Sequence, residues 1–199
     1  QFGVLETAMG AAAEKIEIEA QSDAAAAKAT AAVSRIVMIA AVIAAHPKSD
    51  FDRRETSDGW NGHQIIHHLA QVEGGVTRAL EKIGSTMLAE GTLPMETGTT
   101  SVVEALKRYN VTDRKANPIQ APERVVPPED ADLDVAWPLL QAARASAIAF
   151  MDAFDGRDLT LITRPHPVFG PLNAYEWLAL FGAHEARHLD QLKAALATV

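Results

Sequence analysis

Residues 173–197 read NAYEWLALFGAHEARHLDQLKAALA, and this stretch decides the fold class. Asn173, followed three residues later by Glu176, is typical of a helix N-cap with a capping box. Trp177 and Phe181 begin an apolar stripe that recurs at helical spacing through the rest of the segment. We therefore predict a long helix with one buried face.

His184 and His188 stand four residues apart in the middle of that apolar stripe. Side chains at positions i and i+4 lie on one face of a helix, so both imidazoles can reach one point, as in helical metal sites. The alternative is a pair of core histidines that are hydrogen-bonded separately. Two buried polar groups are harder to satisfy separately, because each needs its own partner. For this pair alone, the two interpretations remain open.

A second helix is predicted from Asn61, which forms a capping box with Gln64. Gly84 is a natural stop for this helix. Its apolar face is formed by Ile65, Leu69, Val72, Val76 and Ile83.

The helical phase separates the three histidines of this second helix. At about 100° per residue, His68 lies at the edge of the apolar face, whereas His63 and His67 point to the opposite side. We interpret His63 and His67 as solvated surface residues. His68 then joins His184 and His188 as the third candidate ligand of one metal ion, and the three nitrogens leave coordination positions open, as in catalytic sites.

Other polar residues near these positions receive weaker assignments. Glu73 lies about 140° from His68 around the helix, so it is not counted as a ligand. Glu185 and Asp190 flank the histidine pair, and a solvated role is favoured over one as hydrogen-bonding partners of the ligands. His166 either approaches the mouth of the site or belongs to a loop, and we favour the loop.

Two further long helices complete the predicted fold. One runs from Asp23 to Ala45, where Pro47 ends it, and the other runs from Asp134 to Phe154 with Pro138 in its first turn. No segment reads convincingly as a strand. We predict an all-α four-helix bundle over residues 22–199, preceded by an uncertain N-terminal arm over residues 1–21.

A long connection separates the second and third long helices. It spans residues 85–132, is rich in Gly, Thr and Pro, and contains a predicted short helix from Ser101 to Tyr109. The stretch from Pro118 to Pro128 holds four prolines, so we predict irregular structure there. A connection of this length in a small domain is usually functional or wraps the body.

The composition excludes several classes of function. A formal net charge of −8 argues against nucleic-acid binding and against adsorption to an anionic membrane. The absence of cysteine excludes thiolate ligands and cysteine nucleophiles. The longest apolar run, residues 36–45, is too short to span a membrane. Residues 1–21 lack the pattern of a signal peptide, and we expect a cytoplasmic protein.

Three motifs resemble DinB-like proteins. They are WNxxQIxxHLAxxE over residues 60–73, HPVFGPLNAYEW over residues 166–177 followed by HxxxHLxQ over residues 184–191, and the Ala-Pro-Glu segment at residues 121–123. The resemblance covers roughly residues 24–197 and leaves out residues 1–21. It is fairly specific, because the order, separation and context of the motifs agree.

The resemblance implies a four-helix bundle with one divalent metal ion on His68, His184 and His188. Nickel or zinc is usual in the family, and iron or manganese is an alternative. Relatives include bacillithiol and mycothiol S-transferases and a mycothiol-dependent maleylpyruvate isomerase, and many form homodimers. Many other members have no known reaction, and this sequence is nearest to them.

These observations lead to one leading hypothesis and two alternatives. The leading hypothesis is a metal-dependent enzyme of the thiol S-transferase type, in which the metal activates a low-molecular-weight thiol cosubstrate or water toward a small-molecule substrate. The alternatives are a metal-dependent hydrolase and a non-catalytic metal-containing stress-response or binding protein. No catalytic residue beyond the ligands is assigned. Arg164 and Arg187 are the basic residues expected near the site.

Overall fold

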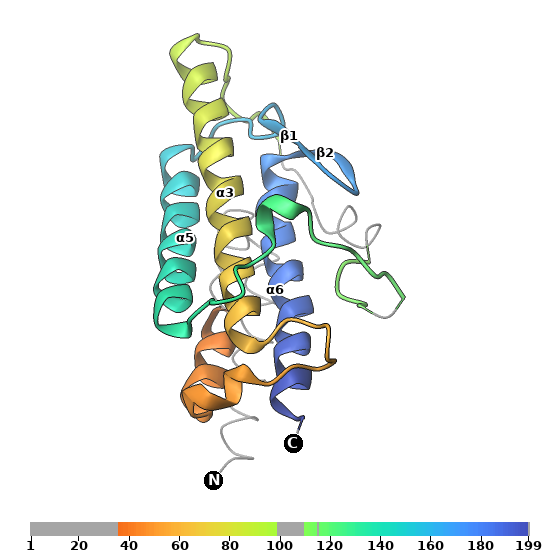
Figure 1. Cartoon of the computed structure of the whole chain (residues 1–199). Coiled ribbons are helices and arrows are strands. Elements are labelled where there is room, and N and C mark those ends of the chain that lie inside the picture. The colour runs from red at the N-terminus through yellow and green to blue at the C-terminus, as the bar shows by residue number, and fades with distance from the viewer. Residues whose placement is uncertain (1–35, 99–109, 115, 199) are drawn as a thin grey trace.

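A computed structural model describes residues 36–98, 110–114 and 116–198. It confirms a mostly helical bundle of the DinB-like kind (Figure 1). Residues 36–45 are helical, and the long helices that follow are α3 (Gly62–Ala89), α5 (Leu133–Ala153) and α6 (Ala174–Leu196). In these residues no helix is both long and apolar enough for a transmembrane segment.

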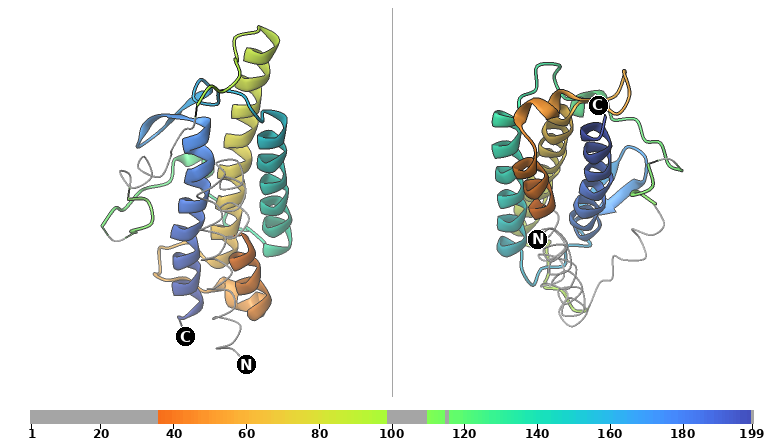
Figure 2. Two further views of the ribbon diagram at one scale, coloured as in Figure 1. Left: turned by 180° about the vertical axis from the view of Figure 1, so that it is seen from behind. Right: turned by 90° about the horizontal axis from the view of Figure 1, so that it is seen from below.

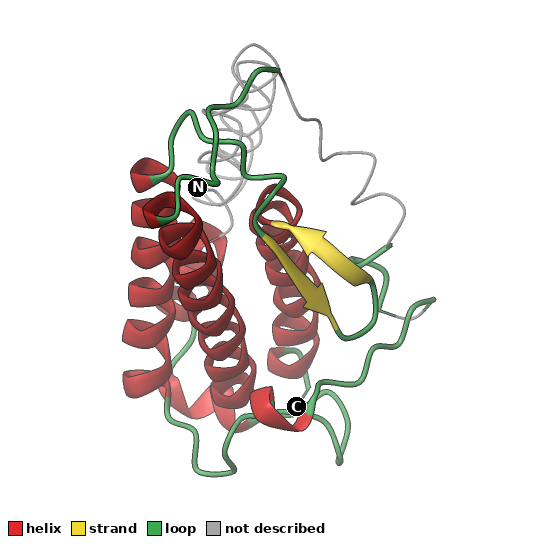
Figure 3. Cartoon of the chain, turned by 90° about the horizontal axis from the view of Figure 1, so that it is seen from above, coloured by secondary structure: helices red, strands yellow, loops and turns green. Residues whose placement is uncertain are grey.

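Helix α3 occupies the centre of the bundle. It lies between α5 and α6 and packs against both (Figures 2 and 3). The helix over residues 36–45 lies at the lower end of the bundle (Figure 2, left). A one-turn 3₁₀ helix, η1 (Lys48–Asp52), leads from that helix toward α3. Because α3 has neighbours on two sides, it buries two faces.

The two helices that carry the candidate ligands both start at predicted capping boxes. At the start of α3 the Gln64 amide donates to Asn61 Oδ1 at 2.9 Å, and the Asn61 amide donates to Gln64 Oε1 at 3.1 Å. At the start of α6 the reciprocal bonds between Asn173 and Glu176 are both 2.9 Å. The caps fix where each helix begins, and therefore the phase of its histidines.

The prediction that α3 stops at Gly84 was wrong, since the helix continues to Ala89. A Cβ atom at Gly84 would lie 2.8 Å from Ile162 Cδ1 and 2.8 Å from Phe154 Cε1. The glycine is required for close packing against these two side chains, and this requirement looks the same in the sequence as a helix stop.

Two short strands replace the loop that was predicted before the last helix. Strands β1 (Thr163–His166) and β2 (Gly170–Asn173) form an antiparallel hairpin beside α6 (Figure 1). Gly170 closes the turn with φ of +77°, a conformation that favours glycine. The prediction that the domain has no strand was wrong here, because two prolines hid the strand pattern.

The long connection between α3 and α5 crosses the face that α3 and α6 share (Figure 1). Its proline-rich part was predicted to be irregular, but it contains a single 3₁₀ turn, η2 (Glu123–Val125), which contacts α3. The predicted helix over residues 101–109, the arm over residues 1–21 and the first part of the predicted helix over residues 23–45 lie outside the described residues.

Helix α5 begins one residue earlier than predicted, at Leu133, with the Asp132 side chain accepting from the Asp134 amide at 2.7 Å. Pro138 therefore lies in the second turn rather than the first. Its missing amide leaves the Asp134 carbonyl without an intrahelical donor, which is tolerated because both residues are exposed.

The apolar core consists of two clusters with polar residues between them. One cluster includes Val76, Phe150 and Phe181, and the other includes Leu69 and Leu140. Each long helix carries buried polar or charged side chains near the point where residues of one cluster are followed by residues of the other. These side chains include His68, Glu73, Arg144, Glu185 and His188. The middle of the bundle is thus a polar layer, and it contains the candidate site.

Candidate metal centre

The structure brings together the three histidines that the sequence singled out. The Nε2 atom of His184 lies 3.2 Å from Nε2 of His68 and 3.1 Å from Nε2 of His188. Across the described residues these three form the only group of His, Cys, Asp or Glu arranged to hold a metal ion, and their ligand atoms all lie within 4.8 Å of one another. Helix α3 supplies one imidazole and α6 supplies two.

Hydrogen bonds at the outer nitrogens orient two of the rings. His68 Nδ1 lies 2.7 Å from the Val125 carbonyl, which can only accept, so Nδ1 carries the proton and Nε2 presents a lone pair. His188 Nδ1 donates in the same way to Gln191 Oε1 at 2.8 Å. Such outer partners are usual for metal-binding histidines, because they fix the tautomer and raise the basicity of the ligand atom.

The donor set fits a cation at the centre of the three rings. Two lone pairs face His184 Nε2, which can donate to only one of them, and His184 Nδ1 is buried with no hydrogen-bond partner in the described parts of the chain. A metal ion bound by three nitrogens at about 2.0–2.1 Å in tetrahedral geometry would hold them about 3.3 Å apart. The two separations that involve His184, 3.1 and 3.2 Å, are close to this value, and all three nitrogens lie within 4.8 Å of one another.

The surroundings keep the three imidazoles neutral. Burial lowers the pKa of His68 to about 4, although the Val125 carbonyl opposes the shift. Burial, and then the neighbouring imidazoles, hold the pKa values of His184 and His188 well below 6.5. Metal binding requires neutral imidazole, so the site is prepared for a cation well below neutral pH.

We predict that metal affinity is largely retained on mild acidification. Three imidazoles of pKa 6.5 would lose about a thousandfold in affinity between pH 7.5 and 5.5, because a proton competes at each nitrogen. Because the pKa of His68 is about 4 and those of His184 and His188 lie well below 6.5, the same change of pH should cost far less affinity than this. Competition titration with a chromophoric chelator at the two pH values measures the difference. A thousandfold loss would show that the imidazoles titrate as free histidine does.

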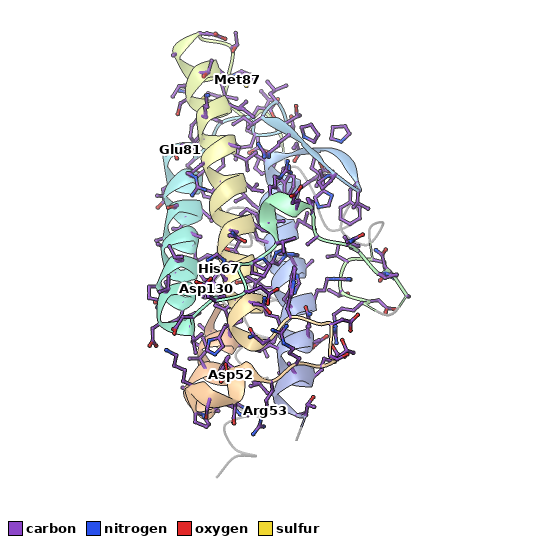
Figure 4. All side chains as sticks on the ribbon, viewed as in Figure 1. Asp52, Arg53, His67, Glu81, Met87 and Asp130 are labelled. Atoms are coloured by element: carbon purple, nitrogen blue, oxygen red, sulfur yellow. The ribbon has the colours of Figure 1, made fainter. Side chains whose placement is uncertain are left out.

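The interpretation of His63 and His67 as solvated residues was wrong. His63 is 5% exposed, and its Nδ1 accepts the amide of Leu133, the first residue of α5, at 2.9 Å. His67, labelled on the lower half of α3 in Figure 4, is half-buried. The face of α3 opposite the site packs against α5 rather than facing water, and a one-face analysis of the helix cannot detect this.

Glu185 was expected to be solvated, but it belongs to a buried charge cluster with Glu73 and Arg144. Arg144 on α5 donates to both oxygens of Glu73 on α3, at 2.9 and 3.0 Å, and lies 2.7 Å from a carboxylate oxygen of Glu185 on α6. Burial and the neighbouring Glu185 carboxylate raise the pKa of Glu73 to about 8. As predicted, Glu73 does not belong to the three-histidine group, and Asp190 is exposed.

The three histidines line one wall of a cavity of about 850 Å³. Trp60 packs on two of them, with ring centroids 4.7 Å from His68 and 6.3 Å from His188. The long connection, the β-hairpin and Phe181 form much of the remaining wall.

His166 was assigned to a loop, but it lies in β1 and lines this cavity. Its ring packs 5.1 Å from that of Trp177. It does not belong to the three-histidine group. The neighbouring prolines, which favour a loop in the sequence, hid both the strand and the position of this side chain.

Comparison with known proteins agrees with this fold. The family model of the DinB superfamily matches residues 23–192, and the chain belongs to this superfamily. The chain is also similar to a Bacillus subtilis (strain 168) protein described as uncharacterized protein YuaE. The two are 25% identical over 151 residues, which cover 71% of this chain and 80% of the relative. Members of the superfamily bind metals, and a three-histidine group that could hold one is present here.

Proposed function

We propose that this protein is a metal-dependent enzyme of the thiol S-transferase type. The observation that carries the proposal is the position of the three Nε2 atoms on the wall of a cavity large enough for a small molecule. Three protein ligands leave coordination positions open on the cavity side, and open sites are usually catalytic, whereas structural sites are closed by four ligands.

A divalent metal bound there would supply Lewis acidity, which lowers the pKa of a thiol or water that reaches it. Nickel or zinc is the proposed ion, with iron or manganese as alternatives, since imidazole alone does not select among them. The Val125 carbonyl and Gln191 would hold two of the rings in place, and Trp60 would keep water from one side of them.

The residues around the site favour a thiol over water as the nucleophile. Hydrolysis by metal-activated water usually requires a carboxylate or imidazole nearby as general base. Asp58 is the one carboxylate in the described lining, and the buried carboxylates of Glu73 and Glu185 are engaged with Arg144. The imidazole of His166 also lines the cavity, but its Nδ1 accepts two backbone amides, so the neutral ring has no free lone pair to act as a base. The chain has no cysteine, so the thiol would come from a cosubstrate.

Substitution with cobalt, whose visible spectrum reports its ligands, tests the proposal. Addition of 2-mercaptoethanol to the cobalt protein should produce a thiolate charge-transfer band, and the band should be absent in the His188→Ala variant. Conjugation of an electrophilic aryl halide to the thiol should then depend on the metal.

Other outcomes of this experiment decide against the transferase. Ester cleavage without thiol, and without any spectral change on adding thiol, would indicate the hydrolase instead. A bound metal that responds to no thiol and supports neither reaction would indicate a non-catalytic metal protein.

A further inference from the structure

The cavity lining is basic in a protein that is acidic as a whole. Its described lining residues include five arginines, no lysine and one carboxylate, Asp58, whereas the net charge of the chain is −8. The arginines are Arg78, Arg114, Arg124, Arg164 and Arg187. A basic cavity in an acidic protein concentrates positive potential where a ligand enters.

Two of these arginines already have partners within the protein. Arg114 forms a bidentate ion pair with Glu55, with distances of 2.7 and 3.1 Å. Arg187 donates to the carbonyls of Val111 and Asn117, both at 3.0 Å, and thereby ties the long connection to α6. These two arginines have a sufficient explanation in the fold.

The other three arginines come from three different elements. Arg78 lies on α3, Arg124 on η2 and Arg164 on β1, and all three line the same cavity. In the described portion of the chain no carboxylate or carbonyl pairs with any of their side chains. A guanidinium group has only donors, so all three present donors without a matching acceptor.

His166 adds a fourth donor to this part of the cavity. Its Nδ1 accepts the backbone amides of Val168 at 3.1 Å and Phe169 at 3.2 Å, so the neutral ring carries its proton on Nε2. Alternate residues of β1 share one face, and Arg164 and His166 are the two half-buried residues of that strand. The charge of Arg124 also acts on His166, which places the two within electrostatic reach.

The cavity has free space beside these donors. Gly75 lies on α3 two turns after His68 and on the same face. A Cβ atom at Gly75 would find nothing within 4 Å, so the helix surface between His68 and Arg78 is open. A ligand can therefore extend along α3 from the histidines to the arginines.

We propose that this cavity binds a substrate carrying an oxyanion, a carboxylate or a phosphate, on Arg78, Arg124, Arg164 and the Nε2–H of His166. Guanidinium groups are suited to both anions because their paired donors match two oxygens. The placement of the reacting end of the substrate at the three histidines rests on the proposed function. The anion site itself does not require it.

Calorimetric titration of the metal-free protein with succinate, inorganic phosphate and succinamide tests the site. Succinamide matches succinate in size but is uncharged. We expect succinate or phosphate to bind at least about tenfold more tightly than succinamide, since hydrogen bonds to charged groups are the strong ones. The tighter of the two anions identifies the class of oxyanion.

Matched variants assign the binding to particular residues. Arg124→Gln and Arg164→Gln should each weaken anion binding by about 10- to 100-fold. Arg114→Gln removes the same charge from the same lining, but one already paired, and should change the affinity by less than about threefold. Arg124 is exposed and Arg164 is half-buried, so both variants should fold, which circular dichroism can verify.

Three results would overturn the anion site: binding of neither anion at millimolar concentration, equal affinity for succinate and succinamide, or equal losses in Arg114→Gln and the two test variants. Because the titration uses metal-free protein, its result is independent of the cobalt experiment. Anion binding without a thiol response would refute the transferase and leave the anion site intact.

Discussion

Replacement of His188 by alanine should remove the divalent metal from the purified protein. A four-ligand zinc site is worth about 10–16 kcal/mol, so one ligand accounts for roughly 3–4 kcal/mol, or about a hundred- to thousandfold in affinity. The wild-type protein should carry close to one metal ion per chain, and the variant close to none after dialysis. Elemental analysis of both proteins measures this directly.

His166→Ala is the matched control for this prediction. The residue is another histidine of the same cavity, but it does not belong to the three-histidine group, so its loss should leave the metal in place. Depletion of metal by His166→Ala, together with retention by His188→Ala, would contradict the assigned ligand set.

Arg144→Met should be among the most destabilising substitutions in the chain. Arg144 is 4% exposed, and its removal would take a buried positive charge away from Glu73 and Glu185, each 0% exposed. Loss of one partner from a buried ionic cluster costs about 3–5 kcal/mol, because the remaining charge stays desolvated. Urea unfolding at neutral pH, compared with wild type, gives the free-energy difference.

The cost of Arg144→Met should also depend on pH. The pKa of Glu73 is raised from 4.5 to about 8, so the folded state binds more protons than the unfolded state between these values. The stability from a protonated Glu73 is therefore complete below pH 4.5 and is lost as the pH rises through about 8. The free energy of unfolding that Arg144→Met removes should therefore be greater at pH 8.5, where Glu73 is ionised, than at pH 5.5.

Arg53→Met is a suitable control for Arg144→Met. Arg53, labelled at the lower end of the bundle in Figure 4, pairs with Asp50 at 2.9 Å, and its side chain is 41% exposed. An exposed ion pair contributes less than about 1 kcal/mol. Similar destabilisation by the two substitutions would show that the buried cluster tolerates an uncompensated charge.

Local signals in the sequence predicted the parts of the fold that depend on them. The capping boxes at Asn61 and Asn173 and the apolar stripes that follow located the starts of α3 and α6, and they phased His68, His184 and His188 correctly. The end of α3 was not predictable in the same way. Gly84 reflects packing against Phe154 and Ile162, which are far away in the sequence.

The sequence could not show what surrounds each helix. The prediction for His63 assumed that α3 has one buried face, whereas α5 covers a second. The pairing of Arg144 with Glu73 and Glu185 joins three helices, and the five arginines of the cavity come from elements spread between residues 78 and 187. Such groups depend on tertiary contacts that no local pattern records.

The hydrogen bond from His68 to the Val125 carbonyl links metal affinity to the conformation of the long connection. Free-energy coupling between two sites is reciprocal. If a substrate that contacts this segment holds Val125 in place and strengthens metal binding, the metal must strengthen substrate binding by the same factor. The protein would then hold its metal more tightly when substrate is present than when the cavity is empty.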